Sequence, residues 1–135
     1  MDFILDAQLA NDSFLIKDLE LTQVRLIDNA NYLWVILVPR VNNIKEILDL
    51  SYQQYTVLNQ EIFFVAKVMQ KLFKPDKLNI ATIGNKVSQL HYHIVVRYIN
   101  DQSFPNPVWG QEAINYRLHL ANDIIEKINF QLTQG

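Results

Sequence analysis

Several short stretches of the chain are rich in apolar residues and are separated by polar residues, which is typical of β-strands joined by turns. Residues 23–27 and 32–38 are rich in β-branched and aromatic side chains, and the polar residues 28–31 lie between them. This pattern predicts a pair of strands joined by a short turn. Pro39 should end the second strand, because proline has no N–H to donate to a neighbouring strand.

The second half of the chain contains another pair of strand-like stretches. Residues 77–83 and 87–98 are rich in apolar residues, and Gly84 and Asn85 form a predicted turn between them. Residues 99–110 contain two prolines and a glycine, which indicates a loop. The sequence therefore predicts strand pairs on both sides of its middle third.

Two other segments have apolar residues at the spacing of helices. Ser51 can cap the first helix, and Gln54 completes a capping box with it. We expect this helix to end before Pro75 and to bury one stripe, formed by Tyr55, Leu58, Ile62, Val65, Ala66, Met69 and Leu72. A second helix is expected over roughly residues 111–130, with Ile114, Leu118, Ala121, Ile125 and Ile128 facing inward.

These elements fit one α+β domain spanning residues 1–135. Neighbouring strands should pair into an antiparallel sheet of about five strands, and the two main helices should pack against it. A chain of 135 residues can bury a hydrophobic core without disulfides or metal ions. We therefore expect a single folded unit.

Composition narrows the possible functions. Half of the residues are hydrophobic and 19% are charged, as in a globular protein, and the net charge of −2 provides no broad basic surface for nucleic acid. The chain has no cysteine, which excludes disulfides, thiolate metal sites and a cysteine nucleophile. No signal peptide or membrane-length apolar run is visible, so we expect a cytoplasmic protein without a membrane partner.

Gln89, His91 and His93 are the most informative residues of the chain. They occupy alternate positions of the stretch 87–98, so on a strand they would share one face, about 7 Å apart at each step. The opposite face is apolar and suits the core; it consists of Leu90, Tyr92, Ile94 and Val96. A face with two imidazoles and an amide gains nothing from packing, so we look for a chemical role.

The residues alone leave several interpretations of the two histidines open. They can be partly exposed side chains of the sheet surface, since histidine is commonly intermediate in burial. They can bind a metal ion, but this needs a third ligand, and no acidic residue lies near them in the sequence. His119 is a poor candidate for that ligand, because its helical neighbours are polar and indicate a solvent-facing side.

Phosphorus chemistry is the third interpretation. Imidazole is a good nucleophile near neutral pH and can form a covalent phosphoryl or nucleotidyl intermediate. A neighbouring donor on the same face can hold the phosphate oxygens, and a glycine at position 84 lets backbone amides approach an anion. This chemistry requires no metal ion.

Around these histidines the chain resembles the histidine triad family of nucleotide hydrolases and transferases. The family pattern is three histidines at alternate positions, separated and followed by apolar residues, after a glycine turn. Residues 84–95 fit this pattern except that Gln89 stands in place of the first histidine. Residues 24–28 and 34–40 are similar to the upstream strands of the family, and residues 107–110 to the loop after the triad. The resemblance covers most of residues 20–110.

The resemblance implies a role for each matching residue. His91 would attack the α-phosphorus and form a nucleotidyl-histidine intermediate, and Asn85, Gln89 and His93 would bind the phosphate. Asp28 would bind the ribose hydroxyls, although an aspartate in a turn would also fit this position.

Residues outside the triad strand receive weaker assignments. Trp109 would either lie by the active site or anchor its loop. Arg40 and Arg97 are expected to be solvated ends of strands outside the site.

The function implied by the resemblance is hydrolysis or transfer at the α-phosphate of a nucleotide conjugate. The substrate would be a purine nucleoside phosphoramidate or a dinucleoside polyphosphate, and no cofactor is implied. The resemblance also implies a homodimer with one continuous sheet. Glutamine keeps a hydrogen-bonding amide but cannot titrate, so a nucleotide-binding module without catalysis is the main alternative. A metal-binding protein using His91 and His93 is the other.

Overall fold

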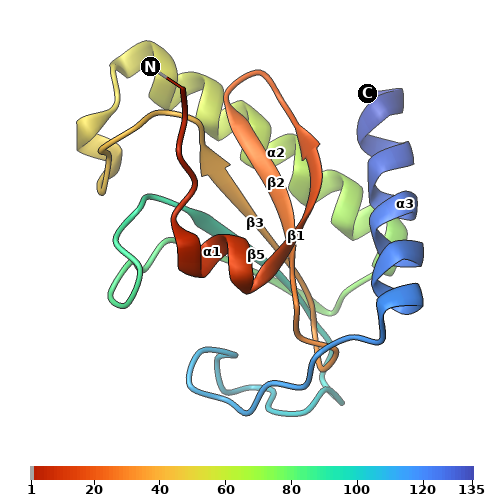
Figure 1. Ribbon diagram of the computed structural model, residues 1–135. Helices are drawn as coiled ribbons and strands as arrows, with labels where there is room; N and C mark the ends of the chain where they lie inside the picture. Colours follow the sequence, from red (N-terminus) through yellow and green to blue (C-terminus); the bar gives the residue numbers. More distant parts are fainter. Residues whose placement is uncertain (1) are drawn as a thin grey trace.

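Five antiparallel strands form the centre of the protein in a computed structural model, which describes residues 2–135 (Figure 1). The strands are β1 Ser13–Asp18, β2 Thr22–Ile27, β3 Leu33–Pro39, β4 Lys77–Ala81 and β5 Tyr92–Arg97. They are arranged in the order β1-β2-β3-β5-β4, so β1 and β4 are the edges of the sheet. The predicted α+β fold class, with its antiparallel sheet of five strands, is confirmed.

Helices cover both faces of this sheet. They are α1 Ala7–Asn11, α2 Tyr52–Phe73 and α3 Leu118–Gln134, with a 3₁₀ turn η1 at Ile47–Asp49. Figure 1 shows α2 and α3 on one side of the strands and α1 on the other. The larger core lies between the sheet and α2 and α3, while a smaller apolar cluster joins α1 to the opposite face. No helix among residues 2–135 combines the length and the hydrophobicity that crossing a membrane requires.

The long helix α2 forms as the sequence predicts. The Ser51 hydroxyl accepts a hydrogen bond from the Gln54 N–H at 3.0 Å, and the Gln54 side chain accepts one from the Ser51 N–H at 2.9 Å. Lys74, in the left-handed conformation with φ of 47°, ends the helix before Pro75. The predicted stripe faces the core: Leu58, Ile62, Val65, Ala66 and Met69 are buried.

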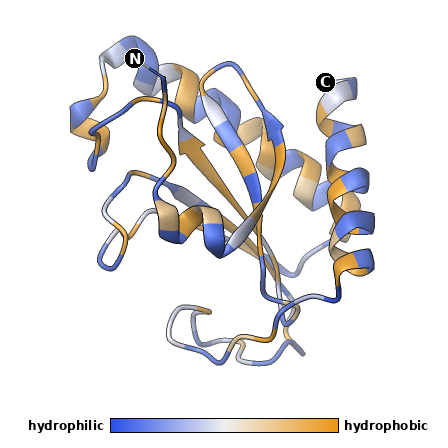
Figure 2. Cartoon of the chain, viewed as in Figure 1, coloured by the Kyte–Doolittle hydropathy of each residue, from blue (hydrophilic) through white to orange (hydrophobic). Residues whose placement is uncertain are grey.

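The C-terminal helix begins at Leu118, seven residues later than predicted. Residues 111–117 are not helical, because their polar groups bond to the turn between β2 and β3. Ala30 donates its N–H to the Ile114 carbonyl at 2.6 Å, and Tyr116 donates its N–H to the Asp28 carboxylate at 2.8 Å. Ile114 and Leu118, predicted to face inward, are therefore exposed, whereas Ala121 and Ile128 are buried as expected. The remaining helix is amphipathic, with hydrophobic and hydrophilic positions alternating along it (Figure 2).

Other predicted boundaries also need correction. The strand expected at 87–98 begins only at Tyr92, because the preceding residues leave the sheet and the Leu90 N–H bonds to the Ile44 carbonyl at 3.0 Å. The strand expected at 77–83 ends at Ala81. Neither β1 nor α1 is predicted from the sequence, since the apolar run Phe14–Ile16 is too short to identify a strand by itself.

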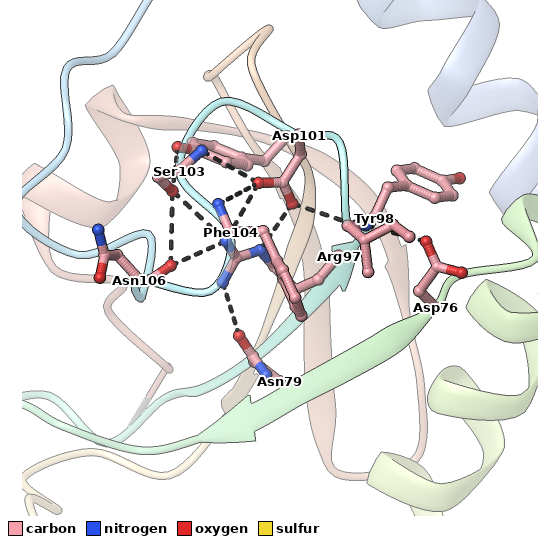
Figure 3. A network of polar contacts seen from close by, with 10 residues as sticks. Asp76, Asn79, Arg97, Tyr98, Asp101, Ser103, Phe104 and Asn106 are labelled. Atoms are coloured by element: carbon pink, nitrogen blue, oxygen red, sulfur yellow. Dashed lines mark hydrogen bonds and ion pairs between the residues drawn. The ribbon is translucent and has the colours of Figure 1, made fainter.

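Arg97 is buried at the end of β5, with 1% of its surface exposed, so the prediction of a solvated strand end is wrong. Its guanidinium donates to both carboxylate oxygens of Asp101, at 2.9 and 3.2 Å. It also donates to the Asn79 side chain on β4 at 2.9 Å and to the Asn106 carbonyl at 2.8 Å (Figure 3). These contacts fix the loop after β5 to two strands of the sheet.

The Asp101 carboxylate stays ionised within this network. Its burial by itself raises the pKa, but hydrogen bonds from Arg97 and from three backbone N–H groups of the loop outweigh that effect and lower the pKa to about 2. A buried guanidinium requires such a partner, since an unpaired buried charge is costly. The loop is therefore held by a charged pair that persists at neutral pH.

Replacing Leu58 should test the packing of α2 on the sheet. Leu58 is fully buried in the larger core, so Leu58→Ala should lower the free energy of unfolding by ~2–5 kcal/mol. Leu48→Ala is the matched control, because Leu48 is 88% exposed and its truncation leaves no cavity. Urea denaturation measures both variants, and equal stabilities would contradict the packing described here.

Candidate functional site

The two histidines predicted to carry the chemistry lie next to each other at one end of β5. His93 is in the strand, paired with Ile36 of β3 and Ala81 of β4, and His91 immediately precedes the strand. Their rings are perpendicular, with centroids 4.8 Å apart, and both residues are buried. The structure therefore brings together the two imidazoles that the sequence places at alternate positions.

The protonation of His91 follows from its hydrogen bond. Its Nδ1 lies 2.6 Å from the Gln89 backbone carbonyl. A carbonyl can only accept, so Nδ1 carries the hydrogen and donates it. In the neutral ring this leaves a free lone pair on Nε2. His91 is thus held in the tautomer that a nucleophile requires.

His93 has the opposite tautomer. The indole N–H of Trp34 on β3 donates to the His93 Nδ1 at 3.0 Å, so the hydrogen of the neutral ring must lie on Nε2. Burial, and to a smaller extent the neighbouring His91, together lower the pKa of His93 to about 3. At neutral pH His93 is therefore an uncharged ring whose Nε2–H is a hydrogen-bond donor.

Aromatic side chains surround His93 and fix its position. Trp109 lies with its ring centroid 5.1 Å from that of His93 and 6.0 Å from that of Trp34, in edge-to-face geometry. Val108, beside it in the loop, is buried in the smaller apolar cluster together with Trp34. Trp109 therefore lies by the histidines, one of the two positions that the sequence allowed for it.

The contact of Trp34 with His93 was not predicted from the sequence. The only signal for it was its position in a predicted strand, three residues after a turn. The contact depends on the pairing of β3 with β5, which sets Trp34 opposite Val95 and Ile36 opposite His93. The local sequence pattern does not specify which strands become neighbours in the sheet.

Gln89 does not share a strand face with the histidines, so that expectation is wrong. It precedes β5, and its side-chain amide turns to the N-terminal segment. The amide oxygen accepts from the Asp6 N–H at 2.8 Å, and the amide nitrogen donates to the Ile4 carbonyl at 3.0 Å. It is the backbone carbonyl of Gln89, rather than its side chain, that contacts His91.

Asn85 lies in the segment between β4 and β5 that leads to the histidines. Gly84 before it has φ of 68°, a conformation that favours glycine. Asn85 is exposed, and its side chain makes no hydrogen bond to any of residues 2–135. The Thr82 hydroxyl donates to the His91 carbonyl at 2.8 Å, which closes this segment onto the site.

Asp28 lies just after β2, as predicted, but its carboxylate has partners in the chain. One oxygen accepts from the Tyr116 N–H and the other from the Asn115 side chain, each at 2.8 Å. Asp28 therefore holds the segment that precedes α3. His119, on α3 itself, is exposed, as expected for a surface residue.

The arrangement is a poor fit for a metal ion. Within residues 2–135, no group of three histidine, cysteine, aspartate or glutamate side chains is placed to hold one. Binding through Nε2 of His93 would also move its hydrogen to Nδ1, where it would oppose the N–H of Trp34. The two rings suit a reaction that uses one lone pair and one N–H.

Comparison with protein-family models matches residues 8–100 to the HIT domain. The solved structure of a histidine triad protein from Bradyrhizobium japonicum is 37% identical, with a TM-score of 0.95 and coverage of 98% of this chain and 99% of that one. A histidine triad protein from Marinobacter aquaeolei VT8 is 38% identical, with a TM-score of 0.95 and coverage of 99% and 98%.

A more distant structure shares the fold alone. The diadenosine triphosphate hydrolase of Plasmodium falciparum is 16% identical, with a TM-score of 0.69 and coverage of 99% of this chain and 84% of that one. No curated protein matches the chain.

The match to the HIT domain spans more than half of the chain and contains all five strands and both buried histidines. The similarity to the two bacterial histidine triad proteins extends over nearly every residue. The protein therefore belongs to the HIT domain family.

Proposed function

We propose that this protein hydrolyses or transfers a nucleotide at its α-phosphate through a nucleotidyl-histidine intermediate on His91. Members of the HIT family hydrolyse or transfer nucleotides. The observation that carries the proposal is the division of tautomers, since His91 offers a lone pair on Nε2 while His93 offers an N–H on Nε2. A nucleophile beside a neutral donor is the pair that displacement at phosphorus requires.

The first step is attack by His91. Its Nε2 forms a bond to the α-phosphorus, and the bond from phosphorus to the leaving group breaks, with the leaving group taking a proton from solvent water. The Nδ1–H stays bonded to the Gln89 carbonyl, which stabilises the positive charge that the ring acquires. Water, or another acceptor in a transfer, then displaces the nucleotide from His91 and regenerates the free imidazole.

Other residues would hold the phosphate and the nucleoside. His93 would donate its Nε2–H to a phosphate oxygen, and Asn85 would donate its free amide from the turn beside the site. Asp28 would bind the ribose hydroxyls, since each of its oxygens has a further lone pair beyond the bond it accepts. Gln89 would contribute to the site through its backbone carbonyl, which holds the His91 Nδ1–H.

The substrate we propose is a purine nucleoside phosphoramidate or a dinucleoside polyphosphate. Both place a leaving group on the α-phosphorus, which a histidine nucleophile can displace without a cofactor. A nucleotide-binding module that lacks catalysis is the alternative, because Gln89 cannot titrate.

Labelling of His91 separates an enzyme from a binding module. Adenosine 5′-phosphoramidate labelled in the phosphate should leave a transient, acid-labile adenylyl group on His91, detected by mass spectrometry of quenched protein. His91→Ala should abolish the label and reduce turnover by ~10³-fold or more, because the nucleophile is lost. His119→Ala is the matched control, since that histidine is exposed on α3. Tight binding of AMP with neither label nor turnover would favour the binding module.

The neutral state of His93 predicts a defined dependence of stability on pH. The folded protein has a lowered pKa of about 3 at this residue, so the unfolded chain binds a proton below about pH 6.5 while the folded protein does not. The contribution of His93 to the free energy of unfolding is therefore complete above pH 6.5 and is lost as the pH falls toward 3. Between pH 7.5 and 4.5, the free energy of unfolding of the wild type should fall by ~2–3 kcal/mol more than that of His93→Gln.

Denaturant titrations of both proteins at several pH values measure this difference. The buried carboxylates are common to both proteins, so their titration cancels. Parallel stability curves for the two proteins would mean that His93 titrates normally in the folded state.

We also propose that two copies pair through the outer edge of β4. This strand ends the sheet, so one row of its N–H and C=O groups has no strand partner, and Ile80 on it is 45% exposed. Light scattering should therefore give a dimer, and Ile80→Lys should shift it toward monomer, since a charge at an edge opposes pairing. Leu15→Lys on the opposite edge, β1, should leave the dimer intact. A monomeric wild type would refute the pairing.

A further inference from the structure

The N-terminal residues 2–6, named here the N-terminal strap, are held along one side by two amide side chains. Asn42, after β3, accepts from the Ile4 N–H at 2.9 Å and donates to the Asp2 carbonyl at 2.8 Å. Gln89 accepts from the Asp6 N–H at 2.8 Å and donates to the Ile4 carbonyl at 3.0 Å. Four backbone polar groups of residues 2, 4 and 6 of the strap are thus bonded to two side chains.

The pattern of these bonds is that of a parallel β-ladder. In such a ladder one residue donates to the carbonyl of residue i and accepts from the N–H of residue i+2. Asn42 bonds to residues 2 and 4 in this way, and Gln89 bonds to residues 4 and 6. Each amide therefore takes the place of the N–H and C=O groups of one residue in a neighbouring strand.

This role explains why position 89 suits glutamine. A glutamine amide offers its donor and acceptor side by side on one planar group, whereas the two nitrogens of a histidine ring point in different directions. Glutamate could accept from Asp6 but could not donate to Ile4. A histidine at position 89, as the family pattern has it, would not make both of these bonds.

The strap also borders a cleft that it lines together with Ser88 and Gln89. A cleft of about 420 Å³ is lined by Ile4 and Asp6 of the strap, by residues 42–45, and by Ser88 and Gln89. Gln89 links this cleft to His91, because its backbone carbonyl holds the His91 Nδ1–H while its side chain holds the strap. Figure 1 shows the N-terminal segment running past the end of β3 to reach α1.

We propose that Gln89 is a positioning residue that holds the N-terminal strap beside His91, and that the strap forms a wall limiting the size of the leaving group. The kinetic part of this proposal rests on the proposed function; the binding of the strap does not. Gln89 then acts on catalysis through its backbone carbonyl and through the strap, without a contact between its side chain and the phosphate.

Hydrogen exchange tests whether the two amides hold the strap as a unit. The Ile4 N–H bonds to Asn42 and the Asp6 N–H to Gln89, so a local effect would expose only one amide in each variant. We expect Gln89→Ala and Asn42→Ala each to accelerate exchange at both amides, and Gln89→Glu to do so despite its retained acceptor. Gln60→Ala, an exposed glutamine on α2, is the control.

Two conjugates with different leaving groups test the wall. Adenosine 5′-phosphoramidate releases ammonia, and AMP morpholidate releases a six-membered ring. The ratio of kcat/KM for the morpholidate to that for the phosphoramidate should rise by about 3- to 10-fold in both Gln89→Ala and Asn42→Ala, because either change frees the strap. Gln60→Ala should keep the wild-type ratio.

The outcomes separate this proposal from the proposed function. A changed ratio in Gln89→Ala with a wild-type ratio in Asn42→Ala would indicate direct contact of Gln89 with substrate and overturn the proposal. Wild-type ratios in both variants, with fast exchange showing that the strap is released, would also overturn it. If the wild type turns over neither conjugate, the proposed chemistry fails, and hydrogen exchange then decides whether Gln89 holds the strap. Slow exchange at the Ile4 and Asp6 amides in Gln89→Ala overturns that role, and fast exchange at both supports it.

Discussion

The buried ion pair between Arg97 and Asp101 is the interaction on which the candidate site depends. Arg97 ends β5, four residues after His93, and its guanidinium is satisfied by β4 and by the loop that follows β5. The pair is costly to desolvate, and it is tolerated because several of its N–H and oxygen positions have partners. The loop held in this way carries Val108 and Trp109 back to the face of the sheet where His93 lies.

From that packing follows the chemistry of the two histidines. Trp109 and Trp34 bury His93, which lowers its pKa, and the Trp34 N–H selects the tautomer with hydrogen on Nε2. His91 lies outside this aromatic group and takes its tautomer from a backbone carbonyl instead. Two residues of the same type, two positions apart, thus acquire different functions from their surroundings. A strand with the same sequence but other neighbours would not separate them.

Gln89 illustrates how one residue can satisfy two requirements. Its backbone carbonyl is fixed by the turn into β5, and there any residue would provide the same acceptor for His91. Its side chain is free to bond elsewhere, and it bonds to a segment more than 80 positions away in the sequence. The identity of residue 89 is therefore coupled to the N-terminal strap, a part of the chain that lies far from residues 84–95 in the sequence.

The sequence by itself determined the elements whose signals are local. The capping box at Ser51, the stripe of α2 and the apolar face of β5 follow from spacing and from hydrogen bonds within a few residues, so they could be predicted. The alternation of His91 and His93 likewise identified the candidate site. Only the tertiary structure decided the start of α3, the burial of Arg97, the partner of Trp34 and the direction of the Gln89 side chain. Each of these depends on a hydrogen bond to a residue that folding brings close, which for Arg97 is Asn79 of β4, and the energy of such a contact is absent from any local pattern in the chain.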